Sequence, residues 1–389
     1  MNARITRALC AATAAGALTA LGLAAAGTVG AASTTQRPGL VTAYVANAGS
    51  DTVTPILATG AAGQPIKVGI GPRAIAITPN GKTAYVANCC FDVTAGDTVT
   101  PISTAIGKAG QPIRVGASPV AIAITPNGKT AYVVSDSGTV TPISTATNTA
   151  GKPIKVGGFP LTIAITPNGK TAYVPGTIGA ANSDTVTPIS TTTNKAGKPI
   201  KVGLFPDAIA ITPNGKTAYV ASDGPDTVTP ISTATGTPGK PIKVGRGPSA
   251  IAVTPNGKTA YVTNIFSDTV TPISTATGTA GKPIRIGKPI KNGGISCIAI
   301  TPDGKTAYVA ITAAGVARTV TPISTATNTA GKPIKVGLFP VAIAITPNGK
   351  TAYVASSGPG TVTPIRTATG TAGQAIKVGS YPSAIAITP

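Results

Sequence analysis

One repeated motif constrains this chain more than any other feature of its sequence. Over residues 342–354 the motif reads as an Ala-Ile-Ala-Ile-Thr run, a Pro-Asn-Gly-Lys turn and a Thr-Ala-Tyr-Val run. Seven copies, some with substitutions, recur every 41 to 47 residues and are marked by Tyr85, Tyr132, Tyr173, Tyr219, Tyr261, Tyr308 and Tyr353. A period in this range is typical of repeat architectures whose units stack on their neighbours.

Each unit also carries two further apolar segments, Thr-Val-Thr-Pro-Ile and then Pro-Ile-Lys-Val or a close relative. All four segments are short, rich in Ile, Val, Thr and Tyr, and bounded by Gly, Pro or Asn. These are strand signals, and no helical period follows residue 32. The Thr-Pro-Asn-Gly-Lys connection predicts a tight hairpin, because Pro fixes φ and Gly takes the left-handed position. Each unit is therefore predicted to be a four-stranded antiparallel meander.

The chain resembles the YVTN-type β-propeller repeat family, whose members include secreted surface-layer and surface-antigen-like propellers. Residues 261–264 read Tyr-Val-Thr-Asn, residues 44–47 and 85–88 read Tyr-Val-Ala-Asn, and the family's strand order is matched across residues 40–389. The resemblance implies an all-β propeller in which each four-stranded unit is one blade. Family members often have seven blades, whereas each segment occurs eight times here.

The two ends of the chain carry complementary parts of one unit. The Ala-Tyr-Val around Tyr44 has no Ala-Ile-Ala-Ile-Thr run before it, and such a run at Ala384–Thr388 ends the chain. We therefore predict an eight-bladed propeller closed by a split blade, with one strand from the C-terminus and three from the N-terminus. The proline inside every Thr-Val-Thr-Pro-Ile segment predicts either a bulge or a backbone position without a partner.

Residues 1–32 differ from the rest of the chain. Arg4 and Arg7 precede an apolar run rich in Ala, Leu and Gly, and small residues follow near Ala31. This pattern predicts a secretory signal peptide, with residues 33–39 as a linker and 40–389 as one propeller domain. An uncleaved anchor is the alternative, since the run is long enough to span a bilayer. We expect a secreted or cell-surface monomer with no membrane span once the segment is cleaved.

Loop lengths vary on one face of the predicted disc. The connections after the second and the fourth strand differ in length between units, whereas the other two are nearly constant. Loops on a rigid scaffold often carry function, although neutral drift is the alternative. The candidate ligand-binding residues on this variable face are Cys89, Cys90, Phe91, Asp92, Lys288, Lys291 and Asn292. Cys89 and Cys90 could form a vicinal disulfide or remain thiols, and a bridge from either to Cys297 is not expected.

The chain is strongly basic, with 31 Lys and Arg against 10 acidic residues and a net charge of +21. The hairpin turns on the other, constant face carry a candidate polyanion-binding set: Lys82, Lys129, Lys170, Lys216, Lys258, Lys305 and Lys350. We expect a second set to join them on this face: Lys152, Lys198, Lys240, Lys282 and Lys332. A third set, one cation in each outermost strand, is explained by protection of an exposed sheet edge.

The residue types present restrict the available chemistry. The sequence contains no His, no Glu and no Trp, so it lacks imidazole ligands and the catalytic triads that use His. Lactonases and streptogramin-type lyases, which the fold resembles, rely on His, Glu and a divalent metal in a central site. We therefore predict no catalysis, no cofactor and no metal. The Asp before several Thr-Val-Thr-Pro segments, such as Asp51, could hold calcium, but capping of a turn is the preferred interpretation.

The sequence alone thus favours a non-catalytic binding or structural module. Its expected partner is a protein or an anionic polymer of the cell envelope, because a secreted basic disc attracts anions. Nucleic acid is not expected, since stacking aromatic residues are scarce at 4% of the chain. Two alternatives remain: a propeller enzyme of the lyase or lactonase type, and an envelope-associated binder of nucleic acid or another polyanion.

Overall fold

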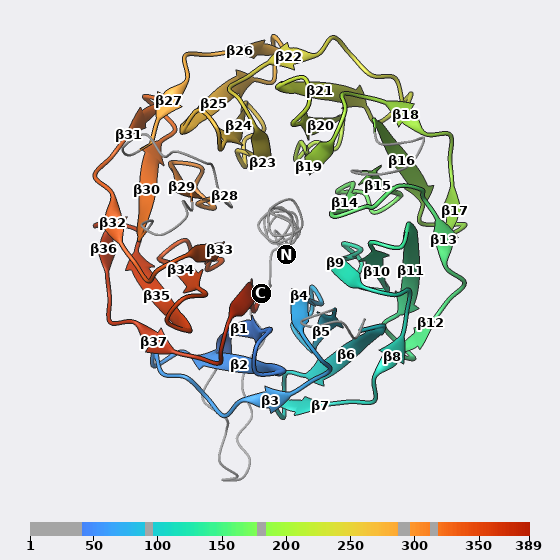
Figure 1. The fold of residues 1–389 in the computed structure, drawn as a ribbon, viewed down its shortest axis with the longest axis vertical. Helices are drawn as coiled ribbons and strands as arrows, with labels where there is room; N and C mark the ends of the chain where they lie inside the picture. The colour runs from blue at the N-terminus through green and yellow to red at the C-terminus, as the bar shows by residue number, and fades with distance from the viewer. Residues whose placement is uncertain (1–40, 90–95, 177–183, 287–295, 312–317) are drawn as a thin grey trace, which may run out of the picture.

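The computed structural model describes residues 41–89, 96–176, 184–286, 296–311 and 318–389. These residues form 38 strands and no helix. The strands make eight sheets arranged around a common axis, with sequence-adjacent sheets side by side (Figure 1). The predicted eight-bladed propeller is therefore confirmed. Since the described residues contain no helix, none is long and apolar enough to cross a membrane. The predicted signal peptide and linker lie outside the described residues.

The first strand of each blade lies nearest the axis (Figure 1). We number the blades from the one that contains both chain ends. The innermost strands of blades 1 to 8 are β38 (Pro382–Ile387), β4 (Pro72–Ile77), β9 (Pro119–Ile124), β14 (Ala164–Ile165), β19 (Pro206–Ile211), β23 (Pro248–Val253), β28 (Ser296–Ile300) and β33 (Pro340–Ile345).

The second and third strands follow outward in the same blade order. The second strands are β1 (Val41–Asn47), β5 (Thr83–Asn88), β10 (Thr130–Ser135), β15 (Thr171–Gly176), β20 (Thr217–Ser222), β24 (Thr259–Asn264), β29 (Thr306–Ile311) and β34 (Thr351–Ser356). The third strands are β2 (Thr52–Leu57), β6 (Thr98–Ser103), β11 (Thr139–Ser144), β16 (Thr185–Ser190), β21 (Thr227–Ser232), β25 (Thr269–Ser274), β30 (Thr319–Ser324) and β35 (Thr361–Arg366).

The outermost strand is short and in most blades consists of two separate pieces. Blades 1 and 5 have a single piece, β3 (Ile66–Lys67) and β22 (Ile242–Lys243). The other blades have two: β7 (Lys108–Ala109) and β8 (Ile113–Arg114), β12 (Thr149–Ala150) and β13 (Ile154–Lys155), β17 (Lys195–Ala196) and β18 (Ile200–Lys201), β26 (Thr279–Ala280) and β27 (Ile284–Arg285), β31 (Thr329–Ala330) and β32 (Ile334–Lys335), and β36 (Thr371–Ala372) and β37 (Ile376–Lys377).

The break in the outer strand accommodates the proline of the third strand. In blade 3, Pro142 pairs with Tyr132 without a register shift, and its carbonyl oxygen accepts a 2.7 Å hydrogen bond from Gly151 N. A strand residue directs its N and its O to the same side, so the missing N–H of Pro142 faces the outer strand, between its two pieces. Of the two predicted possibilities, the structure shows the backbone position without a partner.

The core lies between blades. Each repeat tyrosine packs against the neighbouring blade, as Tyr132 of blade 3 does against Leu161 and Val174 of blade 4. Three of these tyrosines also donate to an asparagine of the next blade, and Tyr132 Oη lies 2.6 Å from Asn194 Oδ1. Because the second strands are covered by blades on both sides, they are buried along most of their length instead of alternating with polar residues.

The C-terminal strand closes the ring. Strand β38 pairs antiparallel with β1, with Ile387 opposite Ala43 and Pro382 opposite Asn47. Thr388 adds a hydrogen bond from its N–H to Thr42 O at 3.0 Å. The predicted split blade is thus confirmed, and strands β38, β1, β2 and β3 form blade 1 in that order.

A buried polar contact at the end of the second strand differs between blades. In blades 1, 2 and 6 this residue is Asn, and Asn88 Nδ2 donates to Thr98 Oγ1 at 3.2 Å and Thr100 Oγ1 at 2.9 Å. In blades 3, 5 and 8 it is Ser, as at Ser356. Within the described residues, the hydroxyls of Ser356, Thr361 and Thr363 are buried without a hydrogen-bond partner.

We expect Ser356→Asn to stabilise the protein by about 1 kcal/mol, because the new amide would satisfy two buried hydroxyls. Asn88→Ser, the reverse change in blade 2, should destabilise it by a similar amount. Urea unfolding followed by circular dichroism measures both. A loss of stability in Ser356→Asn would show that blade 8 cannot accept the amide that blade 2 already holds.

Candidate active site

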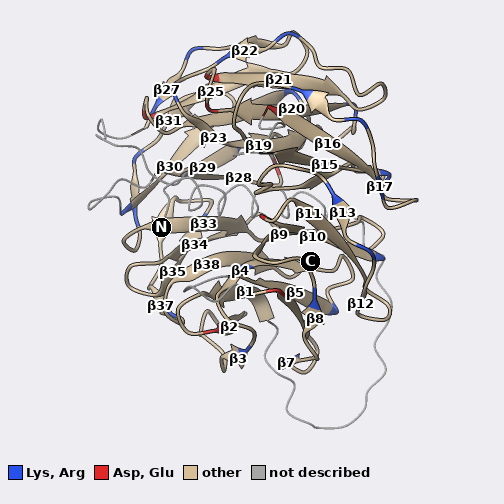
Figure 2. Ribbon diagram, turned by 45° about the vertical axis from the view of Figure 1, so that its right-hand side comes forward, with Lys and Arg blue, Asp and Glu red and all other residues tan. Residues whose placement is uncertain are grey.

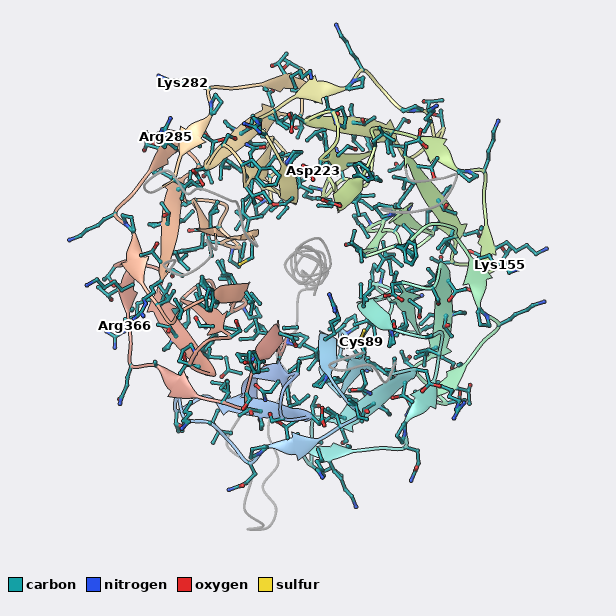
Figure 3. The ribbon with its side chains drawn as sticks, in the orientation of Figure 1. Cys89, Lys155, Asp223, Lys282, Arg285 and Arg366 are labelled. Atoms are coloured by element: carbon teal, nitrogen blue, oxygen red, sulfur yellow. The ribbon has the colours of Figure 1, made fainter. Side chains whose placement is uncertain are left out.

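Of the seven residues predicted to bind a ligand, the structure describes one, Cys89. Cys89 lies at the inner end of blade 2, near the axis (Figure 3), and it is fully buried with Val120 and Leu161 of the next two blades. The other six candidates, Cys90, Phe91, Asp92, Lys288, Lys291 and Asn292, lie outside the described residues. Cys297 is a buried thiol in a separate core cluster, so it is not close to Cys89.

The predicted turn lysines all lie at one face, in the hairpins between the first and second strands. Each is exposed, and its backbone N–H donates to the Asn or Asp two residues earlier, as Lys82 N does to Asn80 Oδ1 at 3.0 Å. Gly81 adopts φ +71° in this turn, as predicted for the left-handed position. The five lysines expected beside them lie instead along the outer edges of their blades. In blade 3, Lys152 falls between β12 and β13, opposite the middle of β11. That part of the prediction is wrong.

Each innermost strand of six blades begins with a β-bulge next to its proline. In blade 2, Pro72 pairs with Asn88 and Ala74 with Ala87, so Arg73 is the extra residue. Bulges re-aim side chains and are common beside active sites. The residues at this position are Arg73, Val120, Asp207, Ser249, Val341 and Ser383. The bulge thus places charged and hydroxyl groups at the ends of the strands that line the axis.

Arg73 of blade 2 and Asp136 of blade 3 carry opposite charges and interact electrostatically. Asp136 directly follows β10, and its backbone N–H donates to Ser118 O at 3.1 Å. Burial raises the pKa of the Asp136 carboxyl above its ordinary value, while the nearby Arg73 guanidinium and a hydrogen bond from Ser118 act in the opposite direction. Arg73 itself is 7% exposed. The pair combines a carboxylate that can take up a proton with a cation that can stabilise negative charge.

Two further acidic residues belong to blade 5. Asp207 occupies the bulge position and is 6% exposed, and Asp223 follows strand β20. Asp223 N donates to Phe205 O at 3.0 Å, and the Asp223 side chain lies at the inner end of its blade (Figure 3). Blades 2, 3 and 5 therefore each bring an ionisable group toward the axis at the variable face.

The residue before each inner-strand proline adopts an unusual backbone conformation. Ser118, Phe205, Phe339 and Tyr381 all have φ between +49° and +56°. For bulky side chains this region is strained, and such strain concentrates at functional sites. Ser118 is also the hydrogen-bond partner of Asp136, so the strained position directly orients the candidate carboxylate.

Apolar side chains also gather on the variable face. Of the six large hydrophobic residues exposed in the described parts of the chain, five lie in its loops: Ile70, Phe159, Leu204, Phe266 and Tyr381. Several rest on glycines. A Cβ at Gly247 would lie 2.4 Å from Phe266, and one at Gly49 would lie 2.6 Å from Tyr381. We call these five residues the apolar rim.

The recurring aspartates before the third strand cap loops. Asp51 adopts φ +53°, and its Oδ1 accepts a hydrogen bond from Gly71 N at 2.8 Å. Asp226 makes the same contact with Gly247 N at 2.9 Å. Within the described residues, no group of three or more side chains has the composition of a metal site.

A groove of about 570 Å³ lies away from the axis, between blades 7 and 8. Arg318, Lys335, Leu338 and Thr361 are among its lining residues, and no carboxylate is. Because a hydrolytic site needs a general base, we place the candidate active site at the axis instead.

The fold and these groups define a class of propeller with ionisable residues at the inner strand ends. The chain belongs to the family described as lactonase, 7-bladed beta-propeller, which it matches over residues 95–371. The structure has eight blades, one more than that description states.

Solved structures of similar fold support the architecture. A chain of the Kuenenia stuttgartiensis hydrazine synthase shares 25% identity, with a TM-score of 0.62 over 77% of this chain and 96% of its own. The dihydro-heme d1 dehydrogenase NirN shares 14%, with a TM-score of 0.73 over 91% and 77%. A putative 6-phosphogluconolactonase from Bacteroides fragilis shares 19%, with a TM-score of 0.60 over 92% and 100%. At 14% and 19% identity the likeness concerns the fold alone. No curated protein matched the sequence.

Membership of the lactonase family contradicts two predictions made from the sequence. The interpretation as a non-catalytic binding or structural module is wrong, and so is the prediction that the chain is not an enzyme. The error was to treat the absence of His and Glu as the absence of a general base. Asp136, in a partly buried site that raises its pKa, offers one.

The sequence analysis also missed Arg73, Asp136, Asp207 and Asp223. Arg73 and Asp207 follow a proline at a position where other units have Val, Leu or Ser. This departure from an otherwise uniform repeat was a usable signal, because a charge beside a strand that lines the axis requires a reason.

Proposed function

We propose that this protein is a hydrolase that opens lactones, cyclic esters, with water. The observation that carries the proposal is the Arg73–Asp136 pair, which two adjacent blades bring together at the axis of a lactonase-family propeller. Asp136 supplies a base, Arg73 supplies a fixed positive charge, and both come from rigid strand ends. Positioning of this kind is a major source of catalytic power.

The proposed reaction uses these two groups as follows. Asp136 takes a proton from water as the water oxygen bonds to the lactone carbonyl carbon. The carbonyl π electrons move to the carbonyl oxygen, and Arg73 stabilises the resulting negative charge. When the tetrahedral intermediate collapses, the ring C–O bond breaks and its oxygen receives the proton from Asp136. The product is a hydroxy acid.

The apolar rim favours a substrate with an apolar substituent. Four of its five side chains lie in the loops that lead into the inner strands, beside the proposed reaction site, and Phe266 lies in the loop between β24 and β25 on the same face. Binding sites commonly combine an apolar lining with a few polar groups that orient the ligand. We therefore propose neutral lactones that carry an alkyl or similar group.

The proposal also includes the type of repeat to which the blades belong and the cellular location of the protein. The Tyr-Val-Thr-Asn motif supports placement among YVTN-type repeats, and the composition of residues 1–32 supports export from the cell. An exported hydrolase would meet its substrate outside the cytoplasm.

Hydrolysis of a panel of γ- and δ-lactones with increasing alkyl chains, followed in a pH-stat, tests the proposal. We expect Asp136→Asn and Arg73→Gln to lower kcat/KM by roughly 10²- to 10³-fold, as for loss of a general base or of an oxyanion-stabilising group. Because the pKa of Asp136 is raised above 3.8, activity should fall with decreasing pH through a midpoint above that value.

Asp226→Asn is the matched control. It removes a carboxylate, keeps the cap on Gly247 and should leave activity unchanged, since Asn tolerates positive φ. Failure of the wild-type protein to hydrolyse any lactone in the panel would contradict the proposal, and so would full activity in Asp136→Asn.

A further inference from the structure

The circumference of the disc carries an uneven distribution of positive charge. Every outermost strand presents at least one exposed Lys or Arg, and blue segments mark the outer strands at β8, β13 and β17 (Figure 2). Three residues before the Lys or Arg that follows the Ile of each outermost strand, blades 3 to 7 have a second cation, whereas blades 8, 1 and 2 have a glutamine. The glutamines are Gln374, Gln64 and Gln111. At this position the eight blades divide into two contiguous groups. Blades 2 and 4 carry a further exposed cation elsewhere in their outer strands, at Lys108 and Lys195, and blade 8 carries one at the end of its third strand, at Arg366.

We call the cations of blades 3 to 7 the lysine arc. It consists of Lys152, Lys155, Lys198, Lys201, Lys240, Lys243, Lys282, Arg285, Lys332 and Lys335, and all ten residues are exposed. The labelled members Lys155, Lys282 and Arg285 lie at the outer edge of the ring (Figure 3). Two cations in each of five consecutive blades form a curved band of one sign.

Protection of sheet edges does not explain the arc. One charge in each outer strand is sufficient for that purpose, and all eight blades have it. The extra lysine of blades 3 to 7 lies three residues before the outer-strand cation, and this pair recurs in five neighbouring blades. The nearby contacts are weak, since Lys201 Nζ lies 3.5 Å from Asp184 Oδ2 with a side chain that is 81% exposed. The arc cations are therefore available to a partner.

We propose that the lysine arc binds a linear polyanion without bases, such as an anionic polysaccharide or polyphosphate. The charge pattern follows the circumference, so a flexible chain could lie along it and contact several blades at once. Stacking residues for bases are missing from the described outer strands, because the exposed aromatic side chains Phe159, Phe266 and Tyr381 all lie in variable-face loops. Binding at the circumference leaves the proposed active site at the axis open to substrate.

Two charge-matched variants of the full chain test this assignment. The arc variant replaces Lys152, Lys198, Lys240, Lys282 and Lys332 with Gln, the residue that three other blades already have at this position, so folding should be unaffected. The turn variant replaces Lys82, Lys129, Lys170, Lys216 and Lys258 with Gln. Each variant loses five positive charges, and circular dichroism verifies that both are folded.

Titration with labelled heparin, polyphosphate and double-stranded DNA at 50 to 300 mM NaCl gives the readout. For heparin or polyphosphate, we expect the arc variant to raise Kd about tenfold or more. Its slope of log K against log salt should become shallower by roughly 3.5 to 4.5, at about 0.7 to 0.9 for each of the five lost contacts. The turn variant should change Kd less than twofold. Preference between heparin and polyphosphate would identify the source of the anionic groups.

Three results would overturn the proposal. Equal weakening in both variants would mean that only net charge matters. Tighter binding of DNA than of either base-free polymer would make nucleic acid the partner. Wild-type protein with no salt-dependent binding to heparin or polyphosphate would show that the arc serves solubility alone.

Discussion

Removal of residues 381–389 should lower the free energy of unfolding by roughly 5 kcal/mol or more. The deletion removes β38, the innermost strand of blade 1, in which Ile385 is 3% and Ala384 1% exposed. Each buried Ile contributes about 1.5 to 3 kcal/mol, and the backbone pairing with β1 is lost as well. Since domains are stable by only about 5 to 15 kcal/mol, the truncated ring should be largely unfolded or associated.

Urea unfolding and analytical ultracentrifugation measure this effect. Exposure of the β1 edge should promote association, because an unpaired edge is a template for another strand. Addition of a synthetic peptide with the sequence of residues 381–389 should restore the monomer, as strand addition does at other sheet edges. Deletion of Pro389 alone is the control, since it spares every pair between β38 and β1. A truncated protein with an unchanged unfolding midpoint would refute closure by this strand.

The sequence predicted the fold well because the repeat is nearly exact. Tyrosine spacing identified the blades, the Pro-Asn-Gly-Lys turns identified the hairpins, and the incomplete motifs at Tyr44 and Ala384 identified the split blade. Each of these signals is local or depends on simple counting. The break in the outer strand was harder, because it depends on Gly151 N meeting Pro142 O across the sheet. Because the sequence did not predict this break, Lys152 was wrongly expected on the constant face.

The candidate active site was not predictable by the same means. Arg73 and Asp136 lie 63 positions apart in the sequence and meet only because adjacent blades pack at the axis. Loop length directed attention to Cys89 and its neighbours, whereas a bulge at constant length re-aims Arg73. A substitution inside a uniform repeat was therefore more informative than an insertion between repeats.

The repeat tyrosines should make the fold abruptly unstable above pH 10. Burial raises the pKa of eight tyrosines above their ordinary value of 10.0: Tyr44, Tyr85, Tyr132, Tyr173, Tyr219, Tyr261, Tyr308 and Tyr353. For Tyr132 the pKa rises to about 12. These side chains lie in the contacts between blades, so the folded ring holds their protons more tightly than the unfolded chain does.

The sign of the effect follows from this difference. Below pH 10 both states are protonated, and the tyrosine contribution to stability is fully present. Above pH 10 the unfolded chain loses protons that the folded ring keeps, so stability falls as pH rises toward 12. One such group contributes up to about 1.4 kcal/mol per pH unit between its unfolded and folded pKa, and the eight tyrosines act in the same direction. A domain is stable by only about 5 to 15 kcal/mol, so a shared loss from several tyrosines is large in comparison.

We therefore expect cooperative unfolding within about one to two pH units above pH 10. Circular dichroism and the phenolate absorbance near 295 nm, recorded in 0.5 M NaCl to screen the lysines, should change together.

Tyr132→Phe and Tyr173→Phe provide matched tests. Both should flatten the alkaline slope by one group. At pH 7 only Tyr132→Phe should lose a strong hydrogen bond, the 2.6 Å contact with Asn194, at a cost of about 1 to 3 kcal/mol. Phenolate formation with a midpoint near pH 10 in a ring that remains folded would show that the tyrosines are not held between the blades as described.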